Sequence, residues 1–138
     1  MGCLFCDLAV GTSDRHVLST EHVAAFLDKS PLFFGHVLVV PKAHVETLVD
    51  LPDERLADFF GALKRVARAV EAGMDAKGTF VAMNNRVSQS VPHLHVHVVP
   101  RTPKDGLKGF FWPRKKYASD EEAAACAQKI RDALRDAG

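Results

Sequence analysis

The chain has 138 residues, of which 47% are hydrophobic and 25% are charged, and its formal net charge at pH 7 is +1. This composition is typical of a globular protein with one domain, long enough to bury a core without disulfide bonds. The small net charge creates no field that would attract nucleic acid or a membrane surface. We therefore expect neither as a partner.

The N-terminal segment has no pattern of an export signal. Its apolar run is broken at Asp7 and Gly11, and no stretch of the sequence is long enough to span a bilayer. The three cysteines, Cys3, Cys6 and Cys126, argue against a disulfide framework in a chain without such a signal. We expect a cytoplasmic protein.

Strands and one long helix are predicted in the first hundred residues. Short apolar runs bounded by turn residues predict strands, which lie at 23–27, 35–41, 79–83 and 91–99. Apolar residues at helical spacing predict a long amphipathic helix that starts near Pro52 and stops at Gly73. These elements predict an α+β fold, in which an antiparallel sheet carries one long central helix.

A final helix is predicted near the end of the chain. Ser119 and Glu122 form a capping box, and an apolar stripe that includes Cys126 follows it, so we expect a helix over about 119–136 with Cys126 in the core. No internal repeat or low-complexity linker divides the sequence. We therefore predict a single domain over residues 1–138, with a core at 3–101 and a C-terminal extension at 102–138.

The last predicted strand carries three histidines at alternate positions, His93, His95 and His97. Side chains alternate across a strand, so these imidazoles are expected on one open face of the sheet. The apolar residues of the same segment are expected on the opposite face, against the core; they are Leu94, Val96 and Val98. The segment therefore predicts three imidazoles on a single surface.

One metal ion does not account for all three imidazoles. The first and third Cα atoms would lie about 13 Å apart, whereas each bond from zinc to nitrogen is about 2.1 Å. A neutral imidazole is a good nucleophile near pH 7, and neighbouring histidines can stabilise negative charge on phosphoryl oxygens. The pattern indicates attack on phosphorus, with the central His95 as the nucleophile.

Three segments of the sequence together resemble the histidine triad family. The run Gln89–Arg101 matches the family signature, His-x-His-x-His followed by two apolar residues. The strand Gly35–His44 resembles the second family motif, and residues 26–28 resemble the segment that holds the nucleoside. The resemblance extends from about Cys3 to Arg101, in the order of the family. It implies a HIT-like fold and a symmetric homodimer.

The resemblance also implies an activity. The protein would be a hydrolase or transferase that cleaves a bond to the α-phosphate of a nucleoside phosphoramidate or a dinucleoside polyphosphate. His95 would carry the nucleotidyl group in a covalent intermediate. His36 and His97 would contact the phosphate or the leaving group, and Gln89 and Ser90 would support them. The partners would thus be small molecules that contain a nucleoside monophosphate.

The nucleoside would be bound by residues from several segments. Asp28 would bind the ribose hydroxyls, since a carboxylate can accept hydrogen bonds from two vicinal hydroxyls. Asn84 is the candidate for a further contact with the substrate. An apolar slot for the base would be formed by Leu4, Leu8, Phe26 and Leu38. An ordinary hydrophobic core is the alternative interpretation of these four residues.

The spacing Cys3-x-x-Cys6 is used in structural zinc sites. The resemblance implies that His44 and His93 complete a Cys₂His₂ site. Without zinc, His93 would hydrogen-bond to the main chain and orient His95 as part of the catalytic triad. A redox motif, or two small side chains in a core, are the alternatives for the two cysteines.

Two segments depart from the family pattern. The segment 84–89 is short, and Ser88 replaces the glycine that close approach to a phosphate favours. The stretch 109–117 interleaves aromatic residues with three cations. It could stack a second base or hold a polyphosphate, but we favour packing on the core or on a partner subunit.

Two other functions are compatible with the sequence. The short segment 84–89 leaves open a nucleotide sensor that binds without catalysis. A small metalloenzyme could also use the histidine strand together with an acidic ligand. Incubation with adenosine 5′-phosphoramidate separates the enzyme from the sensor, and metal analysis separates both from the metalloenzyme.

Overall fold

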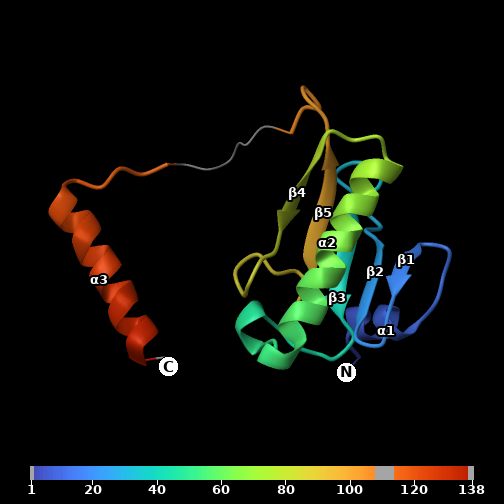
Figure 1. Cartoon of the computed structure of the whole chain (residues 1–138), viewed down its shortest axis with the longest axis horizontal. Helices are drawn as coiled ribbons and strands as arrows, with labels where there is room; N and C mark the ends of the chain where they lie inside the picture. Colours follow the sequence, from blue (N-terminus) through green and yellow to red (C-terminus); the bar gives the residue numbers. More distant parts are fainter. Residues whose placement is uncertain (1, 108–113, 137–138) are drawn as a thin grey trace. The chain divides into compact units, whose positions relative to one another are not determined.

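The computed structural model describes residues 2–107 and 114–136 (Figure 1). Contacts between residues group the chain into two compact units, Met1–Asp105 and Gly106–Gly138. Their boundary lies close to the predicted boundary between core and extension at 101 and 102, and a single domain over the whole chain stays a prediction. Within the described part, none of the helices is both long and apolar enough to cross a membrane.

The first unit is built around a five-stranded antiparallel sheet in the order β1-β2-β3-β5-β4, as predicted for an α+β fold. The strands are β1 (His16–Ser19), β2 (Val23–Leu27), β3 (Val37–Pro41), β4 (Gly78–Ala82) and β5 (Val96–Arg101). The helices are α1 (Leu4–Val10), α2 (Leu56–Gly73) and two 3₁₀ turns, η1 (Leu48–Asp50) and η2 (Asp53–Arg55). Neither β1 nor α1 was predicted from the sequence.

Both faces of the sheet are covered. The long helix α2 lies across one face (Figure 1) and buries a stripe of residues at helical spacing, Phe59, Ala62, Leu63, Val66 and Val70. The short helix α1 packs on the other face, where Phe5 and Ala9 join side chains of β2 and β3. All five residues of β3 are buried, because both faces of this strand are covered; its sequence is accordingly apolar at every position.

The histidine segment is only partly a strand. The paired strand β5 starts at Val96 rather than at the predicted Val91, because the amide of Leu94 bonds instead to the carbonyl of Val45 outside the sheet. The predicted alternation of side chains nevertheless holds. Leu94, Val96 and Val98 join the core under α2, whereas the rings of His95 and Phe5 contact each other on the α1 side.

The loop between β2 and β3 needs a glycine at one position. Gly35 has φ of +95°, in the left-handed region that other residues rarely adopt. A Cβ atom at this place would also lie 2.5 Å from Cγ of Met74, at the end of α2. The close packing of this loop against α2 places His36 directly before β3.

The second unit contains α3 (Asp120–Asp136). The predicted cap is present in part: Ser119 Oγ accepts from the amide of Glu122, but the carboxylate of Glu122 accepts from Ala118 rather than from Ser119. Nothing in α3 is buried, so the prediction that Cys126 belongs to a core is wrong; the described part of this unit contains no second helix or strand to cover the apolar stripe. Residues 109–113 of the aromatic stretch lie outside the described residues.

Candidate functional site

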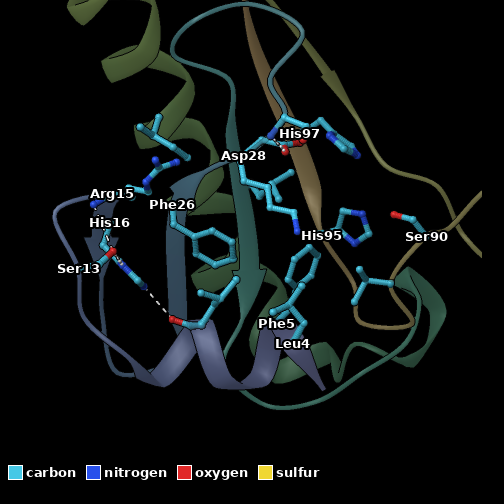
Figure 2. Close-up of a pocket in the computed structure, with 16 residues that line it drawn as sticks. Leu4, Phe5, Ser13, Arg15, His16, Phe26, Asp28, Ser90, His95 and His97 are labelled. Carbon is cyan, nitrogen blue, oxygen red and sulfur yellow. Dashed lines mark hydrogen bonds between the residues drawn. The ribbon is translucent and has the colours of Figure 1, made fainter. Parts of the chain in front are cut away.

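A cavity of about 350 Å³ opens on the α1 side of the sheet (Figure 2). Its volume is in the range of pockets that bind small molecules. It is lined by Leu4, Phe5, Leu8, Ser13, Arg15, His16, Phe26, Leu27, Asp28, Lys29, Ser30, Leu38, Ser90, Val91, His95 and His97. The predicted apolar slot, the predicted ribose ligand Asp28 and two histidines of the triad therefore meet in one place.

The apolar part of the cavity is formed by α1, β2 and β3. All four predicted slot residues, Leu4, Leu8, Phe26 and Leu38, line it. Phe5, which was not predicted as a slot residue, also lines the cavity, and its ring packs edge-on against that of Phe26 with centroids 5.7 Å apart. Apolar residues at positions 4, 5, 8 and 9 have helical spacing, and this pattern was the available signal for α1.

His16 was also missed, and it joins α1 to β1 at the cavity wall. Its Nε2 donates to the carbonyl of Leu8 (2.7 Å), so Nδ1 carries the lone pair and accepts from Oγ of Ser13 (2.9 Å). The ring lies 5.5 Å from that of Phe26. A single histidine outside a motif gave no signal for this role in the sequence.

The ring of His95 is held in one tautomer by the main chain. Its Nδ1 lies 2.7 Å from the carbonyl oxygen of His93, which can only accept, so Nδ1 carries the proton and Nε2 the lone pair. Nε2 makes no hydrogen bond within the described residues. Every fully buried side-chain nitrogen or oxygen atom of the described residues has a hydrogen-bond partner. Because Nε2 of His95 has none, it is not fully buried and is accessible at the cavity wall.

The prediction of an open histidine surface is wrong. His36 and His95 are each 3% exposed, and His93 is fully buried. The ring of Phe5 in α1 packs on His93 and His95, and His36 is enclosed by its contacts with Leu32 and His97. His95 and His97 line the cavity, whereas His93 and His36 are not among its lining residues.

A second chain of hydrogen bonds fixes the tautomers of His36 and His97. The amide of Leu32 can only donate, and it donates to Nδ1 of His36 (3.0 Å), so the proton of His36 is on Nε2. That Nε2 donates to Nδ1 of His97 (2.9 Å), which leaves an N–H at Nε2 of His97. The main chain therefore determines which nitrogen of His97 is a donor.

His97 is neutral at pH 7. Burial is the largest cause that lowers its pKa, the neighbouring His36 and His95 also lower it, and Asp28 acts in the opposite direction; the resulting pKa is about 4. Burial also lowers the pKa of His36, although the carboxylate of Asp28 opposes this shift. Each of the two paired imidazoles thus carries one proton, on Nε2, and neither carries a positive charge at pH 7.

Asp28, His36 and His97 have ligand atoms within 4.8 Å of one another, which is a possible donor set for a metal ion. The hydrogen bonds argue against this use. Nε2 of His36 carries the proton, because Nδ1 accepts from Leu32, and its lone pair is therefore not free to bind a cation. The geometry fits a hydrogen-bond chain better than the metalloenzyme considered from the sequence.

Asp28 lies at the end of β2 and lines the cavity. Its Oδ1 accepts from the amide of Ser30 (2.9 Å) in an Asx turn, and its Oδ2 lies 3.6 Å from Nε2 of His36. The turn holds the carboxylate at the cavity while leaving acceptor capacity on both oxygens.

Two predicted substrate residues have other contacts. The amide of Gln89 donates to the carbonyl of Glu46 (2.6 Å) and accepts from the amide of Arg86 (2.8 Å), and Asn84 donates to the carbonyl of Ser88 (3.1 Å). Of the described residues, neither Gln89 nor Asn84 is among those that line the cavity. The hydrogen bonds of both side chains hold the loop instead. Of the three polar residues predicted here to contact substrate, Asn84, Gln89 and Ser90, only Ser90 lines the cavity.

The same loop has unusual backbone geometry. Arg86 and Ser88 have φ of +74° and +59°, in the left-handed region. This conformation costs residues other than glycine about 1–2 kcal/mol each. A glycine at position 88, as in the family pattern, would adopt this conformation without strain. In this chain the hydrogen bonds of Asn84 and Gln89 hold the loop with Ser88 in its place.

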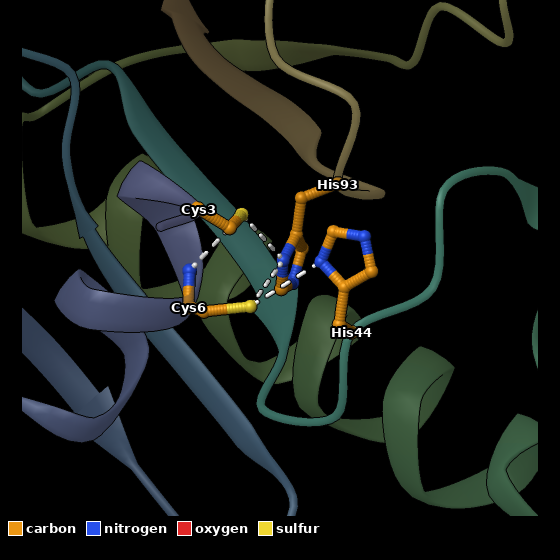
Figure 3. A group of neighbouring side chains, drawn as sticks. All are labelled: Cys3, Cys6, His44 and His93. Atoms are coloured by element: carbon orange, nitrogen blue, oxygen red, sulfur yellow. Dashed lines mark hydrogen bonds between the residues drawn. The ribbon is translucent and has the colours of Figure 1, made fainter. Parts of the chain in front are cut away.

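Cys3, Cys6, His44 and His93 come together beside the cavity, as predicted (Figure 3). The Sγ atoms of Cys3 and Cys6 each lie 3.4 Å from Nδ1 of His93, and Sγ of Cys6 lies 3.3 Å from Nδ1 of His44. Tetrahedral zinc, with bonds of about 2.3 Å to sulfur and about 2.0 Å to nitrogen, separates such ligands by about 3.5 Å. The group therefore has the spacing of a tetrahedral site.

The protonation of the group also suits a cation. Nε2 of His93 donates to the carbonyl of Pro41 (2.8 Å), so the lone pair on Nδ1 points to the thiols. Burial raises the pKa of the Cys6 thiol, and its hydrogen bond with Cys3 and the charge there raise it further. Two thiolates at this place consequently need a positive charge to stabilise them.

Relatives of known sequence support the nucleotide chemistry at the level of the family. Protein hit from Bacillus subtilis (strain 168) is 37% identical over 121 residues, which are 86% of this chain and 82% of the relative. Adenosine 5′-monophosphoramidase hnt1 of Schizosaccharomyces pombe is 32% identical over 98% of this chain and 100% of the relative. An asymmetrical bis(5′-nucleosyl)-tetraphosphatase from the same organism is 36% identical over 62% of this chain and 48% of the relative.

Solved structures have the same fold. SMU.412c from Streptococcus mutans UA159 superposes with a TM-score of 0.85 at 32% identity, over 96% of this chain and 85% of that one. A zinc-bound histidine triad family protein from Mycobacterium smegmatis has a TM-score of 0.70 at 31% identity, over 99% and 97%. A HIT domain family model matches residues 11–104. By sequence and by fold, this chain belongs to the HIT domain family.

Proposed function

We propose that the protein is a nucleotide hydrolase or transferase that cleaves a bond to the α-phosphate through a nucleotidyl group on His95. The observation that carries this proposal is the hydrogen bond from Nδ1 of His95 to the carbonyl of His93, which leaves a lone pair on Nε2 at the cavity wall. Nucleoside phosphoramidates and dinucleoside polyphosphates are the substrates in view, and relatives named for both reactions support this class.

The distribution of side chains in the cavity supports one orientation of the nucleotide. The apolar residues of α1, β2 and β3 would hold the base, and Asp28 would accept hydrogen bonds from the ribose hydroxyls. The α-phosphate would then lie at His95, His97 and Ser90, which Figure 2 shows on the opposite side of Phe26 from Ser13 and His16. This order places the reacting phosphorus at the accessible Nε2 of His95.

The chemistry proceeds in two steps. Nε2 of His95 attacks the α-phosphorus, and the bond to the leaving amine or phosphate breaks, with the leaving group taking its proton from solvent. The new imidazolium is stabilised by the hydrogen bond of Nδ1 to the carbonyl of His93. Water then attacks the phosphorus, the bond to Nε2 breaks, and the nucleoside monophosphate is released.

His97 would stabilise charge rather than act as an acid. Because its pKa is about 4, it is neutral at pH 7 and presents an N–H at Nε2. A fixed donor of this kind stabilises negative charge that develops on phosphoryl oxygens. His36 would serve this function indirectly, since it holds the proton that sets the tautomer of His97.

We further propose zinc as the cation held by Cys3, Cys6, His44 and His93. Four protein ligands close the coordination sphere, which is typical of structural rather than catalytic zinc. The donor set, the spacing of the ligand atoms and the zinc-bound relative support this assignment. The ion would supply positive charge that stabilises the two thiolates.

Replacement of His95 by alanine is expected to abolish turnover of adenosine 5′-phosphoramidate while AMP binding stays within a few-fold of the wild type. Mass spectrometry of rapidly quenched wild type should detect a nucleotidyl adduct on His95. The control is His22→Ala, which removes a histidine from outside the cavity. Full turnover by His95→Ala would exclude the covalent mechanism, and binding without product in the wild type would favour a nucleotide sensor.

The stability of the fold is expected to decrease as pH falls from 6.5 to about 4, because His97 has a pKa of about 4 when folded and near 6.5 when unfolded. The unfolded chain binds more protons in this interval, so protonation favours unfolding. Urea unfolding at several pH values should show a smaller dependence for His97→Asn. An unchanged dependence in that variant would contradict the assignment; His36, with its lowered pKa, contributes in the same direction.

Metal analysis is expected to find about one zinc ion per chain in the purified protein. Cys6→Ser should lose most of it, because a thiolate ligand is removed, whereas Cys126→Ser should keep it, since Cys126 lies on α3. Release into a chromophoric chelator measures the content. Zinc retained in full by Cys6→Ser would refute the ligand set.

A homodimer is also part of the proposal. Apolar side chains of α2 and β4, two elements in contact, are exposed: Leu56 (39%), Phe60 (37%) and Val81 (43%). Light scattering after gel filtration is expected to give the mass of two chains, and Val81→Lys should shift it towards one. A wild type that is monomeric at micromolar concentration would refute the dimer.

A further inference from the structure

The helix α1 belongs to the metal group and to the nucleotide cavity at the same time. Cys3 is its N-cap residue, and Cys6 lies in its first turn. Between these two ligands lie Leu4 and Phe5, which both line the cavity. A displacement of the two sulfur atoms therefore displaces the apolar wall of the cavity as well.

Phe5 is the side chain that connects the two sites. It is buried, with 6% of its surface exposed. Its ring centroid lies 6.2 Å from that of the ligand His93, 4.9 Å from that of His95 and 5.7 Å from that of Phe26 in the base slot. All three contacts are edge-on, so the orientation of the Phe5 ring constrains the nucleophile and the base slot together.

His93 connects the same two sites through its backbone. Its Nδ1 faces the sulfur atoms of Cys3 and Cys6, while its carbonyl oxygen accepts a hydrogen bond from Nδ1 of His95 (2.7 Å). A ligand that is fixed by a metal thus fixes the group that orients the nucleophile. The ring of Phe5 packs against the ring of His93, so the two connections share this residue.

Packing on the sheet and contacts at both ends hold α1 in place. It has seven residues, too few to be stable as an isolated helix, and its buried residues Phe5 and Ala9 pack on β2 and β3. Its last turn is tied to β1 by the hydrogen bond from His16 to the carbonyl of Leu8. Its first turn carries Cys3 and Cys6, so a cation bound to these residues would further restrain the end that carries Phe5.

We propose that metal binding and nucleotide binding are coupled in this protein, with Phe5 as the positioning residue that links the two sites. A cation at the cysteine–histidine group raises the affinity for a nucleoside monophosphate, and the nucleotide raises the affinity for the cation by the same factor. We expect a factor of about 10. The inference rests on the proposed function, because it requires that the cavity binds a nucleotide.

The experiment measures both halves of the coupling. Calorimetry gives the affinity for AMP of the zinc-loaded protein and of the protein after removal of zinc by a chelator. Competition with a chromophoric chelator gives the affinity for zinc with and without saturating AMP. Circular dichroism reports whether the metal-free protein is folded. The two factors should agree within error and should be about 10.

The variant Phe5→Ala tests the route of the coupling. It keeps the four ligands, so zinc content should be unchanged, but the coupling factor should fall to about 1–2 because the ring that links the two sites is removed. Phe5→Leu, which restores apolar bulk, should recover part of the coupling. Tyr117→Ala is the matched control, because it removes an exposed aromatic ring outside the first unit and should keep the full factor.

The outcomes separate the inference from its premise. Equal AMP affinities with and without zinc in a folded protein would overturn the coupling. If the metal-free protein unfolds, every ligand of the folded state is linked to zinc through folding; a factor in Phe5→Ala equal to that of the wild type would then overturn the role of Phe5. Absence of AMP binding by the zinc-loaded wild type would instead overturn the proposed function.

Discussion

The hydrogen bond from Nδ1 of His95 to the carbonyl of His93 is the contact on which the site depends. A backbone carbonyl has no donor role, so the bond leaves a single assignment for the proton of the ring and directs the lone pair of Nε2 to the cavity. The bond exists because the chain at His93 has not yet entered the ladder of β5, and its carbonyl is therefore free to accept from a side chain two residues ahead.

The same principle governs the second pair of histidines. The amide of Leu32 begins a chain that passes through His36 and ends at the N–H of His97. Main-chain groups at fixed positions thus assign every imidazole that faces or supports the cavity, and burial keeps His97 neutral. With these tautomers, His95 can act as a nucleophile and the neutral His97 beside it as a hydrogen-bond donor. Nε2 of His36 carries a proton, so it has no lone pair for a metal ion shared with Asp28.

The helix α1 converts one face of the sheet into a binding site. It covers strands β2 and β3, packs Phe5 on His93 and His95, and supplies part of the apolar wall of the cavity. It is also the shortest α-helix of the described chain, and its first turn carries two of the four residues in the cysteine–histidine group. The stability of the cavity and the occupancy of that group are therefore expected to depend on each other.

The sequence by itself determined the α+β class, the long helix and the alternation of the histidine segment, because periodicity is a local property of the chain. The meeting of Cys3 and Cys6 with His44 and His93 was implied only by the family resemblance, since these residues lie far apart in the sequence. Only the tertiary structure decided that the histidines are buried, that α1 exists and that Phe5 joins two sites. Burial depends on which element covers a face, and a short helix is stabilised by packing rather than by its own residues.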